Sequence, residues 1–153
     1  MKAPFTAVIT IVLLAARLGV SANANAQDRC DEKQNQWFRQ ADPKTWTALH
    51  TLFSKFGDCD DGAISEGFSE DVAQLFLKQW THLETLNHLI ASDRPFRNFV
   101  LRHIDASLDE DELNGIAENA KSRCPTWGTQ LCHSVESKAQ SSLAEFSQRR
   151  PKS

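Results

Sequence analysis

The apolar residues of this chain recur every three to four residues from about residue 46 to residue 146. A helix presents residues at that spacing on one face, whereas a half-buried strand alternates apolar and polar residues. The enrichment in β-branched residues that marks strands is also absent. We therefore predict an all-α fold, a compact bundle or a short array of about five to six helices. The clearest stripes are Trp46, Leu49, Phe53 and Phe56, followed by Ile64, Phe68, Val72, Leu75 and Phe76.

Capping residues predict where several of these helices begin and end. Asp42-Pro43 fits an N-cap followed by proline at the first helical position, and Gly57 ends that helix. Asp93 precedes a helix with proline in its first turn. The segment Ser107-Leu108-Asp109-Glu110 fits a capping box, in which Ser107 is the N-cap. The helix that follows is expected to close at Cys124-Pro125, and a last helix to run from about residue 127 to residue 146.

The first 26 residues have the organisation of a cleavable export signal. Lys2 gives a basic start, an apolar run extends from Phe5 to Ala16, and the stretch Ala22-Asn23-Ala24-Asn25-Ala26 offers small residues for cleavage. An uncleaved membrane anchor is disfavoured because the apolar run is short and Arg17 follows it. We expect cleavage after Ala26, a single helical domain over 27–148 and a disordered tail over 149–153. The mature protein would then be periplasmic or secreted, with no membrane contact.

The chain has four cysteines, Cys30, Cys59, Cys124 and Cys132, and all of them follow the predicted leader. An even number of cysteines in an exported chain is most simply read as a set of disulfides. Three pairings are possible, and the sequence alone does not choose among them. We favour Cys30 with Cys59 and Cys124 with Cys132, because each pair would join neighbouring elements. A structural zinc site is disfavoured because no two cysteines have the short spacing of zinc ligands.

The charge of the chain argues against a nucleic-acid partner. The net charge is −3, and loss of Lys2 and Arg17 with the leader would make it about −5. Binding to phosphates needs clustered lysine and arginine, and the only basic run is the short tail Arg149-Arg150-Pro151-Lys152. An acidic surface instead suits a basic protein partner.

The segment Asp58-Cys59-Asp60-Asp61-Gly62-Ala63-Ile64-Ser65-Glu66 resembles half of a calcium loop. With Gly62 at the glycine position of an EF-hand, three ligand positions fall on Gly57, Cys59 and Phe68. None of these side chains supplies a carboxylate. The simpler interpretation is that Asp60 or Asp61 caps a helix that starts near Gly62.

Catalytic motifs are absent from the sequence. Ser65 lies between glycines whose spacing differs from that of a nucleophile elbow. Asp105 follows His103 by two residues, so the two side chains would leave a helix in different directions. The five histidines, of which we expect most at the surface, include no metal-binding H-E-x-x-H pair. We therefore predict that the chain is not an enzyme and carries no cofactor or metal.

Tryptophan and arginine concentrate the binding energy of protein interfaces. Trp46 and Trp80 fall on or near apolar stripes, whereas Trp37 and Trp127 lie near cysteines and turns, where we expect exposure. Gly67 interrupts a helical pattern, which predicts that another helix or a partner approaches closely there. The residues that we expect to contact a partner are Trp37, Glu66, Gly67, Arg94, Arg97, Arg102 and Trp127.

Two functions from different classes are compatible with these features. The first is a small exported helical binding protein, similar in size and layout to the periplasmic immunity proteins of antibacterial secretion systems. Such an immunity-type or inhibitor protein would neutralise a toxin or hydrolase in the bacterial envelope, and the acidic surface favours a basic one. The alternative is a calcium-binding protein that uses the segment 58–66 with the acidic cluster 105–112, or a structural envelope protein without a single specific partner. The sequence does not indicate the oligomeric state.

Overall fold

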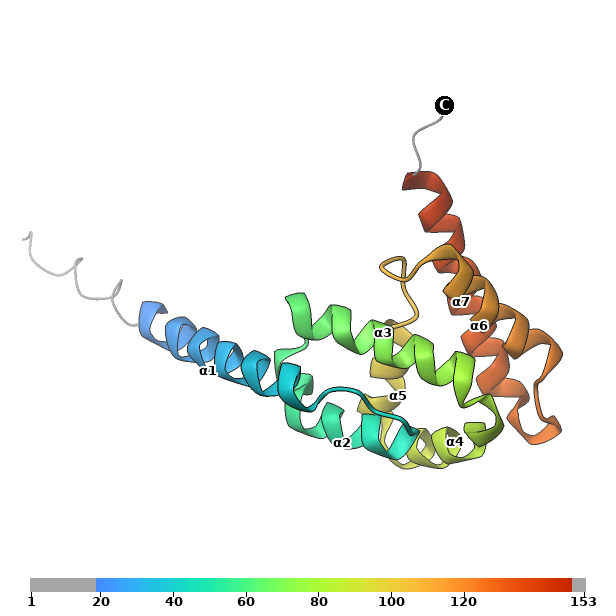
Figure 1. The fold of residues 1–153 in the computed structure, drawn as a ribbon, viewed down its shortest axis with the longest axis horizontal. Helices are drawn as coiled ribbons and strands as arrows, with labels where there is room; N and C mark the ends of the chain where they lie inside the picture. The colour runs from blue at the N-terminus through green and yellow to red at the C-terminus, as the bar shows by residue number, and fades with distance from the viewer. Residues whose placement is uncertain (1–18, 150–153) are drawn as a thin grey trace, which may run out of the picture.

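The computed structural model describes residues 19–149. Within these residues there are seven α-helices and no strand, so the predicted all-α fold is confirmed, with one helix more than expected (Figure 1). Three single 3-10 turns, at Gly57–Cys59, Trp80–His82 and Thr126–Gly128, lie between helices. The helices are α1 (Gly19–Gln40), α2 (Trp46–Phe56), α3 (Gly62–Lys78), α4 (Leu83–Ser92), α5 (Arg94–Arg102), α6 (Glu110–Ser122) and α7 (Thr129–Arg149).

Helix α3 lies between the two halves of the fold. On one side it packs against α2 and α1, and on the other it packs against α6, which runs along α7 (Figure 1). Helices α4 and α5 pack on each other, α4 contacts α2, and α5 contacts α7. Phe68 and Phe99 are buried at the aromatic centre with their rings 4.6 Å apart, and the partly buried ring of Phe53 lies 4.7 Å from that of Phe99. These rings come from α2, α3 and α5, so the predicted apolar stripes meet in one core.

Helix α1 is the element that the apolar pattern did not predict. Its residues 27–40 are almost entirely polar, and Trp37 and Phe38 are the only large apolar side chains among them. The ring of Trp37 nevertheless packs 4.2 Å from the ring of Phe68 and 5.5 Å from that of Phe56. One aromatic ring and one disulfide anchor α1 on the core, and Lys33 adds contacts to the Lys55 carbonyl and to Asp58, while the first turns of α1 project away from the other helices (Figure 1).

Two helix starts differ from the predictions. Thr45, not Asp42, is the N-cap of α2, and its hydroxyl accepts a hydrogen bond from the Ala48 amide at 3.2 Å. Asp42 lies in the loop before this cap and pairs with Lys44. The capping box of α6 lies two residues later than predicted, on Asp109 with Glu112. The reason is that the Ser107 amide donates to the Asp105 carboxylate at 2.8 Å, which keeps Ser107 in the preceding turn.

The other predicted caps are present. Asp61 is the N-cap of α3, and its carboxylate accepts from the Gly62 amide at 2.8 Å. Asp93 is the N-cap of α5, with proline in the first turn, and it accepts from the Phe96 amide at 2.9 Å. Gly57 closes α2, as expected.

Both favoured disulfides are formed. Cys30 on α1 is bonded to Cys59, with 5.4 Å between their Cα atoms, and Cys124 is bonded to Cys132, with 5.9 Å between theirs. Bonds of this kind persist in oxidising compartments and are rare in the cytosol, which indicates a non-cytoplasmic location. Among the described residues, no helix is both long and apolar enough to cross a bilayer.

The predicted leader falls mainly outside the described residues, which begin at residue 19. The expected cleavage point after Ala26 lies within α1, so residues 27–40 form the part of this helix that would belong to the mature domain. Of the predicted tail, Arg149 is the last residue of α7, and residues 150–153 lie outside the described range.

Candidate functional site

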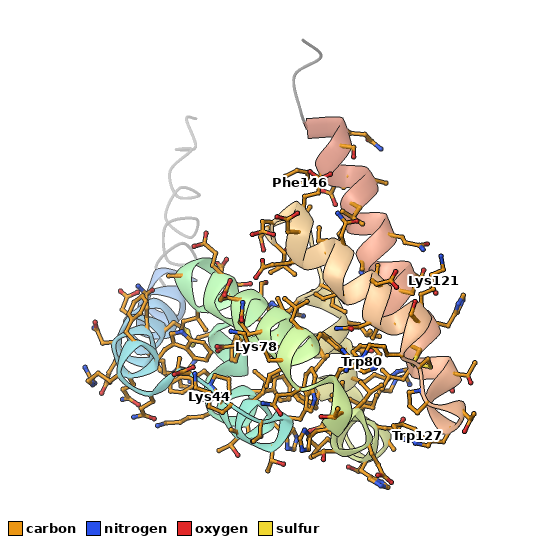
Figure 2. All side chains as sticks on the ribbon, turned by 45° about the vertical axis from the view of Figure 1, so that its right-hand side comes forward. Lys44, Lys78, Trp80, Lys121, Trp127 and Phe146 are labelled. Carbon is orange, nitrogen blue, oxygen red and sulfur yellow. A yellow bond between two sulfur atoms is a disulfide. The ribbon has the colours of Figure 1, made fainter. Side chains whose placement is uncertain are left out.

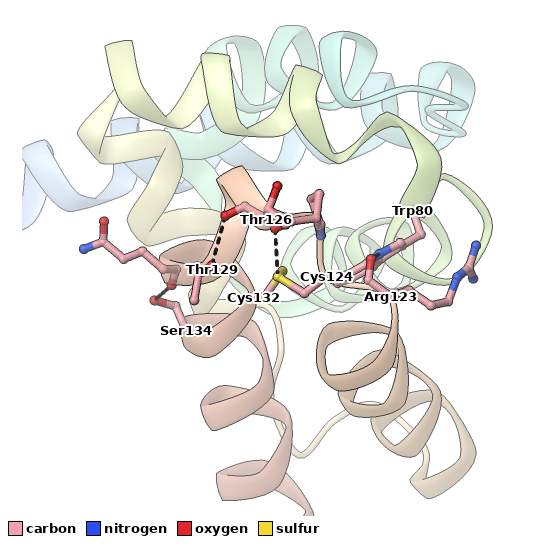
Figure 3. The surroundings of a disulfide bond; sticks show 9 residues. Trp80, Arg123, Cys124, Thr126, Thr129, Cys132 and Ser134 are labelled. Carbon is pink, nitrogen blue, oxygen red and sulfur yellow. Dashed lines mark hydrogen bonds between the residues drawn. A yellow bond between two sulfur atoms is a disulfide. The ribbon is translucent and has the colours of Figure 1, made fainter.

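A disulfide-closed turn between α6 and α7 shapes one surface of the molecule. Cys124 follows the end of α6, and Cys132 lies in the first turn of α7, eight residues further on. Inside the turn, the Gly128 amide donates to the Pro125 carbonyl at 2.9 Å, and the Thr129 hydroxyl donates to the Thr126 carbonyl at 3.2 Å (Figure 3). The covalent bond and these hydrogen bonds limit the conformations open to the turn.

The buried indole of Trp80 fastens this turn to the rest of the fold. Its Nε1 donates to the Arg123 carbonyl at 2.8 Å, across a sequence distance of 43 residues (Figure 3). The carbonyl belongs to the C-cap residue of α6, which would otherwise lack a partner from within the helix. The direction in which the turn leaves α6 is therefore fixed by the core.

Trp127 is the residue that this turn presents to solvent. It is 49% exposed. Among the described residues, the other large apolar side chain that is exposed is Phe38. Figure 2 shows Trp127 at the end of the α6–α7 pair. The indole lies at the edge of a groove of about 200 Å³ between α4, α5 and the start of α7. The groove is lined by Asn87, Ile90, Ala91, Arg97, Trp127, Gln130 and Leu131.

Arg97 supplies the positive charge of this groove. It lies on α5, is partly buried, and forms no ion pair with any residue that the structure describes. The N–H donors of the guanidinium are therefore available to a bound group. Trp127, Ile90 and Leu131 provide apolar surface beside it. A tryptophan, aliphatic side chains and an unpaired arginine in one hollow are the composition typical of the energetic centre of a protein interface. We call this surface the Trp127 groove.

Only some of the residues that we predicted to contact a partner line the Trp127 groove. Arg97 and Trp127 line the same groove, whereas Arg94 is exposed at the start of α5 and Glu66 is exposed on α3. Neither Arg94 nor Glu66 lines the groove. The expected exposure of Trp37 is wrong, because its side chain is only 3% exposed.

Gly67 explains the burial of Trp37. A Cβ atom at this position would lie 2.8 Å from the Trp37 Nε1 atom, so the glycine gives the indole its space. The predicted close approach of another helix to Gly67 is confirmed, and the approaching helix is α1. Trp37 is therefore part of the core, and its indole fills the space beside Gly67.

The acidic segment 58–66 lines a hollow beside the Cys30–Cys59 disulfide, and each of its three aspartates has a partner through one oxygen, while Asp60 Oδ1 is buried without a donor among the described residues. Lys33 donates to Asp58 and holds the pKa of that carboxyl below its usual range. Asp60 pairs with Arg102, and Asp61 caps α3. Among the described residues, no group of three potential ligands is placed to hold a metal ion. The geometry therefore gives the calcium hypothesis no support.

A buried hydrogen-bond chain was missed by the sequence analysis. His103 is 1% exposed, so it is an exception to the expectation that most of the histidines lie at the surface. Its Nε2 lies 3.0 Å from an oxygen of the buried Asp60 carboxylate, and its Nδ1 lies 2.9 Å from the Ser69 hydroxyl. Since the carboxylate only accepts, the imidazole donates from Nε2 and accepts from Ser69 at Nδ1. Burial lowers the pKa of His103, although Asp60 opposes the shift.

These three residues join α3, the turn before it and the end of α5. Ser69 is only 2% exposed, so its hydroxyl is closed to a substrate in this conformation. Phe68 and Phe99 enclose the imidazole, with ring centroids 5.7 and 4.4 Å away. The chain therefore has the features of a buried polar network that fixes the packing of helices. Arg102 also pairs with Asp60, an ion pair that the sequence did not suggest, and so neutralises the carboxylate at the end of this network.

Comparisons of this chain with protein-family models, with curated proteins and with solved structures found no match.

Proposed function

We propose that this chain is an exported binding protein of the immunity or inhibitor type, which neutralises a toxin or hydrolase in the bacterial envelope. The observation that carries the proposal is the Trp127 groove, where a rigidly held, half-exposed indole lies beside an arginine that has no ion-pair partner among the described residues. An indole that lines a groove together with an arginine has the composition in which interface hot spots are enriched.

The rigidity of the groove suits a binding role. Ordering a loop when a complex forms lowers affinity, and a surface that is already ordered avoids this loss. The Cys124–Cys132 bond and the hydrogen bond from Trp80 to the Arg123 carbonyl provide that order before any partner arrives.

The expected destination of the protein agrees with a role in the envelope. The leader pattern of residues 1–26 predicts export to the periplasm or beyond, and the two disulfides require an oxidising compartment to persist. The acidic mature chain would attract a basic partner at long range. At short range Arg97 would pair with a carboxylate of that partner, while Trp127 and Leu131 would bury its apolar side chains.

The test is co-expression in a bacterial periplasm. The mature chain is exported together with the product of the adjacent gene, and growth and co-purification are scored in the same culture. We expect the adjacent product to inhibit growth by itself, the mature chain to restore growth, and the two to purify as a complex. If the mature chain neither restores growth nor forms a complex with this product, the proposal that it inhibits this product is contradicted.

The salt dependence of association tests the electrostatic part of the proposal. Attraction between an acidic inhibitor and a basic partner accelerates association, and dissolved ions screen it. The association rate should therefore fall severalfold between low and high salt. A rate that is unchanged over this range would contradict long-range steering.

A further inference from the structure

The Trp127 groove contains hydrogen-bond donors that no described residue uses. Besides the Arg97 guanidinium, these are the side-chain amides of Asn87 and Gln130. None of the three side chains makes a hydrogen bond or an ion pair with another described residue. Gln130 is exposed, and Asn87 and Arg97 are only partly buried, so all three are accessible to a bound group.

Helical spacing brings these donors together with apolar surface. Helix α4 and the start of α7 each present residues spaced i, i+3 and i+4, namely Asn87, Ile90 and Ala91 from the first and Trp127, Gln130 and Leu131 from the second. Residues at this spacing are neighbours on one helix face, with about 5–6 Å between their Cβ atoms. Each face therefore combines one amide with apolar side chains, and Arg97 adds its charge from α5.

The groove is positively charged although the chain as a whole is acidic. The net charge of the chain is −3, but none of the residues that line the groove is an aspartate or a glutamate. The charge complementary to Arg97 is thus missing from the groove itself. A guanidinium binds a carboxylate through two parallel hydrogen bonds, and the remaining lone pairs of the carboxylate can accept from amides. The donors of the groove therefore match a carboxylate.

The size of the groove limits what can carry that carboxylate. Its volume of about 200 Å³ is below the range of about 300–1,000 Å³ that is typical of pockets for whole small molecules. The occupant is then about one residue, which has to supply both a carboxylate for Arg97 and an apolar group for Trp127 and Leu131. An aspartate or glutamate side chain supplies the charge without the apolar group. A C-terminal apolar residue carries both on one Cα atom.

We propose that the Trp127 groove binds the C-terminal residue of its protein partner, with the α-carboxylate on Arg97 and an apolar side chain between Trp127 and Leu131. The amides of Asn87 and Gln130 donate to the carboxylate and to the last peptide carbonyl. Capture of a C-terminal carboxylate is an established mode of peptide recognition. The inference rests on the proposed function, since it takes a protein as the occupant of the groove, and it specifies which part of that protein enters.

The experiment titrates the disulfide-bonded chain, purified from the periplasm, with the N-acetylated tripeptide Gly-Gly-Leu that has a free C-terminus. Binding is followed by the NMR signals of the Trp127 indole N–H and of the backbone amides over 87–97 and 127–131. The control is the same peptide with a C-terminal amide, which removes the charge and keeps the shape. We expect saturable shifts with the free acid and about tenfold or more weaker binding of the amide, because a hydrogen bond to a charged group is lost.

A second control peptide separates the two sources of a carboxylate in a protein. N-acetyl-Leu-Glu-Gly amide has a leucine and a carboxylate on different residues and has no free C-terminus. It should bind no more tightly than the amide of Gly-Gly-Leu. Binding of this peptide as tightly as the free acid, or equally tight binding of inorganic phosphate, would overturn the proposal.

Two variants with the same change in net charge test the role of Arg97. Arg97→Gln should bind the free acid about as weakly as the unchanged chain binds the amide. Arg94→Gln, at an exposed position on α5 outside the groove, should bind the free acid as the unchanged chain does. Equal binding of the free acid by the two variants would overturn the proposal. Equal binding of acid and amide by the unchanged chain, or no saturable shift at millimolar peptide, would do so without any variant.

Failure of this inference and failure of the proposed function give different results. Suppose that the adjacent gene product binds equally well without its C-terminal residue, while Trp127→Ala still weakens the complex. The groove is then the interface, and the inference about its occupant is wrong. If instead the peptides bind as predicted and that product neither binds nor is inhibited, the inference holds and the proposed inhibition of that product is wrong.

Discussion

The indole of Trp37 on α1 fills the space beside Gly67 on α3, where a Cβ atom on the glycine would lie 2.8 Å from the indole Nε1 atom. The indole is buried beneath this contact and packs edge-on against Phe68. Gly67 therefore lets α1 approach α3 closely enough for its one buried aromatic ring to reach the core.

Replacing Gly67 by alanine should destabilise the protein. Alanine favours a helix over glycine by about 1 kcal/mol, but the added methyl group would force apart two helices at a buried ring, and overpacking of this kind costs about 1–3 kcal/mol. We expect a net loss of up to about 2 kcal/mol in the free energy of unfolding, measured by urea denaturation.

The matched control for this change is Gly115→Ala on α6. Its Cβ would lie 2.7 Å from a terminal methyl group of Leu77, which is partly buried and can turn aside. Here the helix preference of alanine should prevail, and stability should stay the same or rise by up to about 1 kcal/mol. A stable Gly67→Ala variant would show that Trp37 does not pack as described.

Opening the two disulfides should have unequal effects. The bond Cys30–Cys59 closes a loop of sequence separation 29, and Cys124–Cys132 closes one of separation 8. Restriction of the unfolded chain predicts losses of about 3.6 and about 2.6 kcal/mol on replacement of each pair by serine. Thermal unfolding of the two double variants measures these losses, and a melting temperature unchanged by either replacement would contradict a stabilising role for that bond.

The Ser69→Ala variant should lose stability without loss of apolar packing. The change removes the hydroxyl that donates to His103 Nδ1 at 2.9 Å and leaves that nitrogen buried without a donor. The expected cost is about 1–3 kcal/mol. Ser54→Ala, at an exposed position where the hydroxyl bonds only to its own helix, should change stability by less than about 0.5 kcal/mol. Equal effects of the two changes would contradict the network.

Replacing Asp71 by asparagine should stabilise the protein at alkaline pH. The folded protein raises the pKa of this carboxyl from 3.8 to about 7, so it holds the proton more tightly than the unfolded chain does. The contribution of Asp71 to stability is therefore present in acid and is lost as the pH rises through this interval. At pH 8 the variant should gain about 2–4 kcal/mol, and near pH 4 it should gain little. Denaturant titrations at the two pH values measure the difference.

The control for the pH experiment is Asp58→Asn. Lys33 lowers the pKa of the exposed Asp58 carboxyl, so this change should cost a little stability above about pH 4, the opposite direction. An Asp71→Asn variant that is less stable than the unchanged chain at pH 8 would contradict the raised pKa of Asp71.

The sequence predicted the helices that carry a stripe of apolar residues on their buried face. From Trp46 onward, apolar residues recur at helical spacing, and α2, α3, α5, α6 and α7 follow them. Helix α1 was missed because residues 27–40 carry no such stripe, and one ring and one disulfide fix it instead. The favoured disulfide pairing was confirmed: Cys124–Cys132 joins the end of α6 to the start of α7, and Cys30–Cys59 joins α1 to the turn that follows α2.

Of the candidate site, the sequence predicted single residues but not their grouping. The turn that contains Trp127 indicated exposure, and Trp127 is exposed. That Arg97 shares its groove depends on how α4 and α5 pack against α7, which no local pattern encodes. The burial of Trp37 and His103 likewise depends on tertiary partners, namely Gly67 for the first and Asp60 and Ser69 for the second. Gly67 was the one signal in the sequence that pointed to such a contact.

We propose that the Trp127 groove binds a protein partner. The most direct measurement is the affinity of the mature chain for the product of the adjacent gene, compared for the unchanged chain, Trp127→Ala and Phe38→Ala. Phe38 is 65% exposed on α1 and lies outside the groove, so it controls for the loss of an exposed aromatic ring. We predict that Trp127→Ala weakens binding by about 30-fold or more, as for an interface hot spot, and that Phe38→Ala leaves it unchanged. Full affinity in the Trp127→Ala variant would contradict the claim.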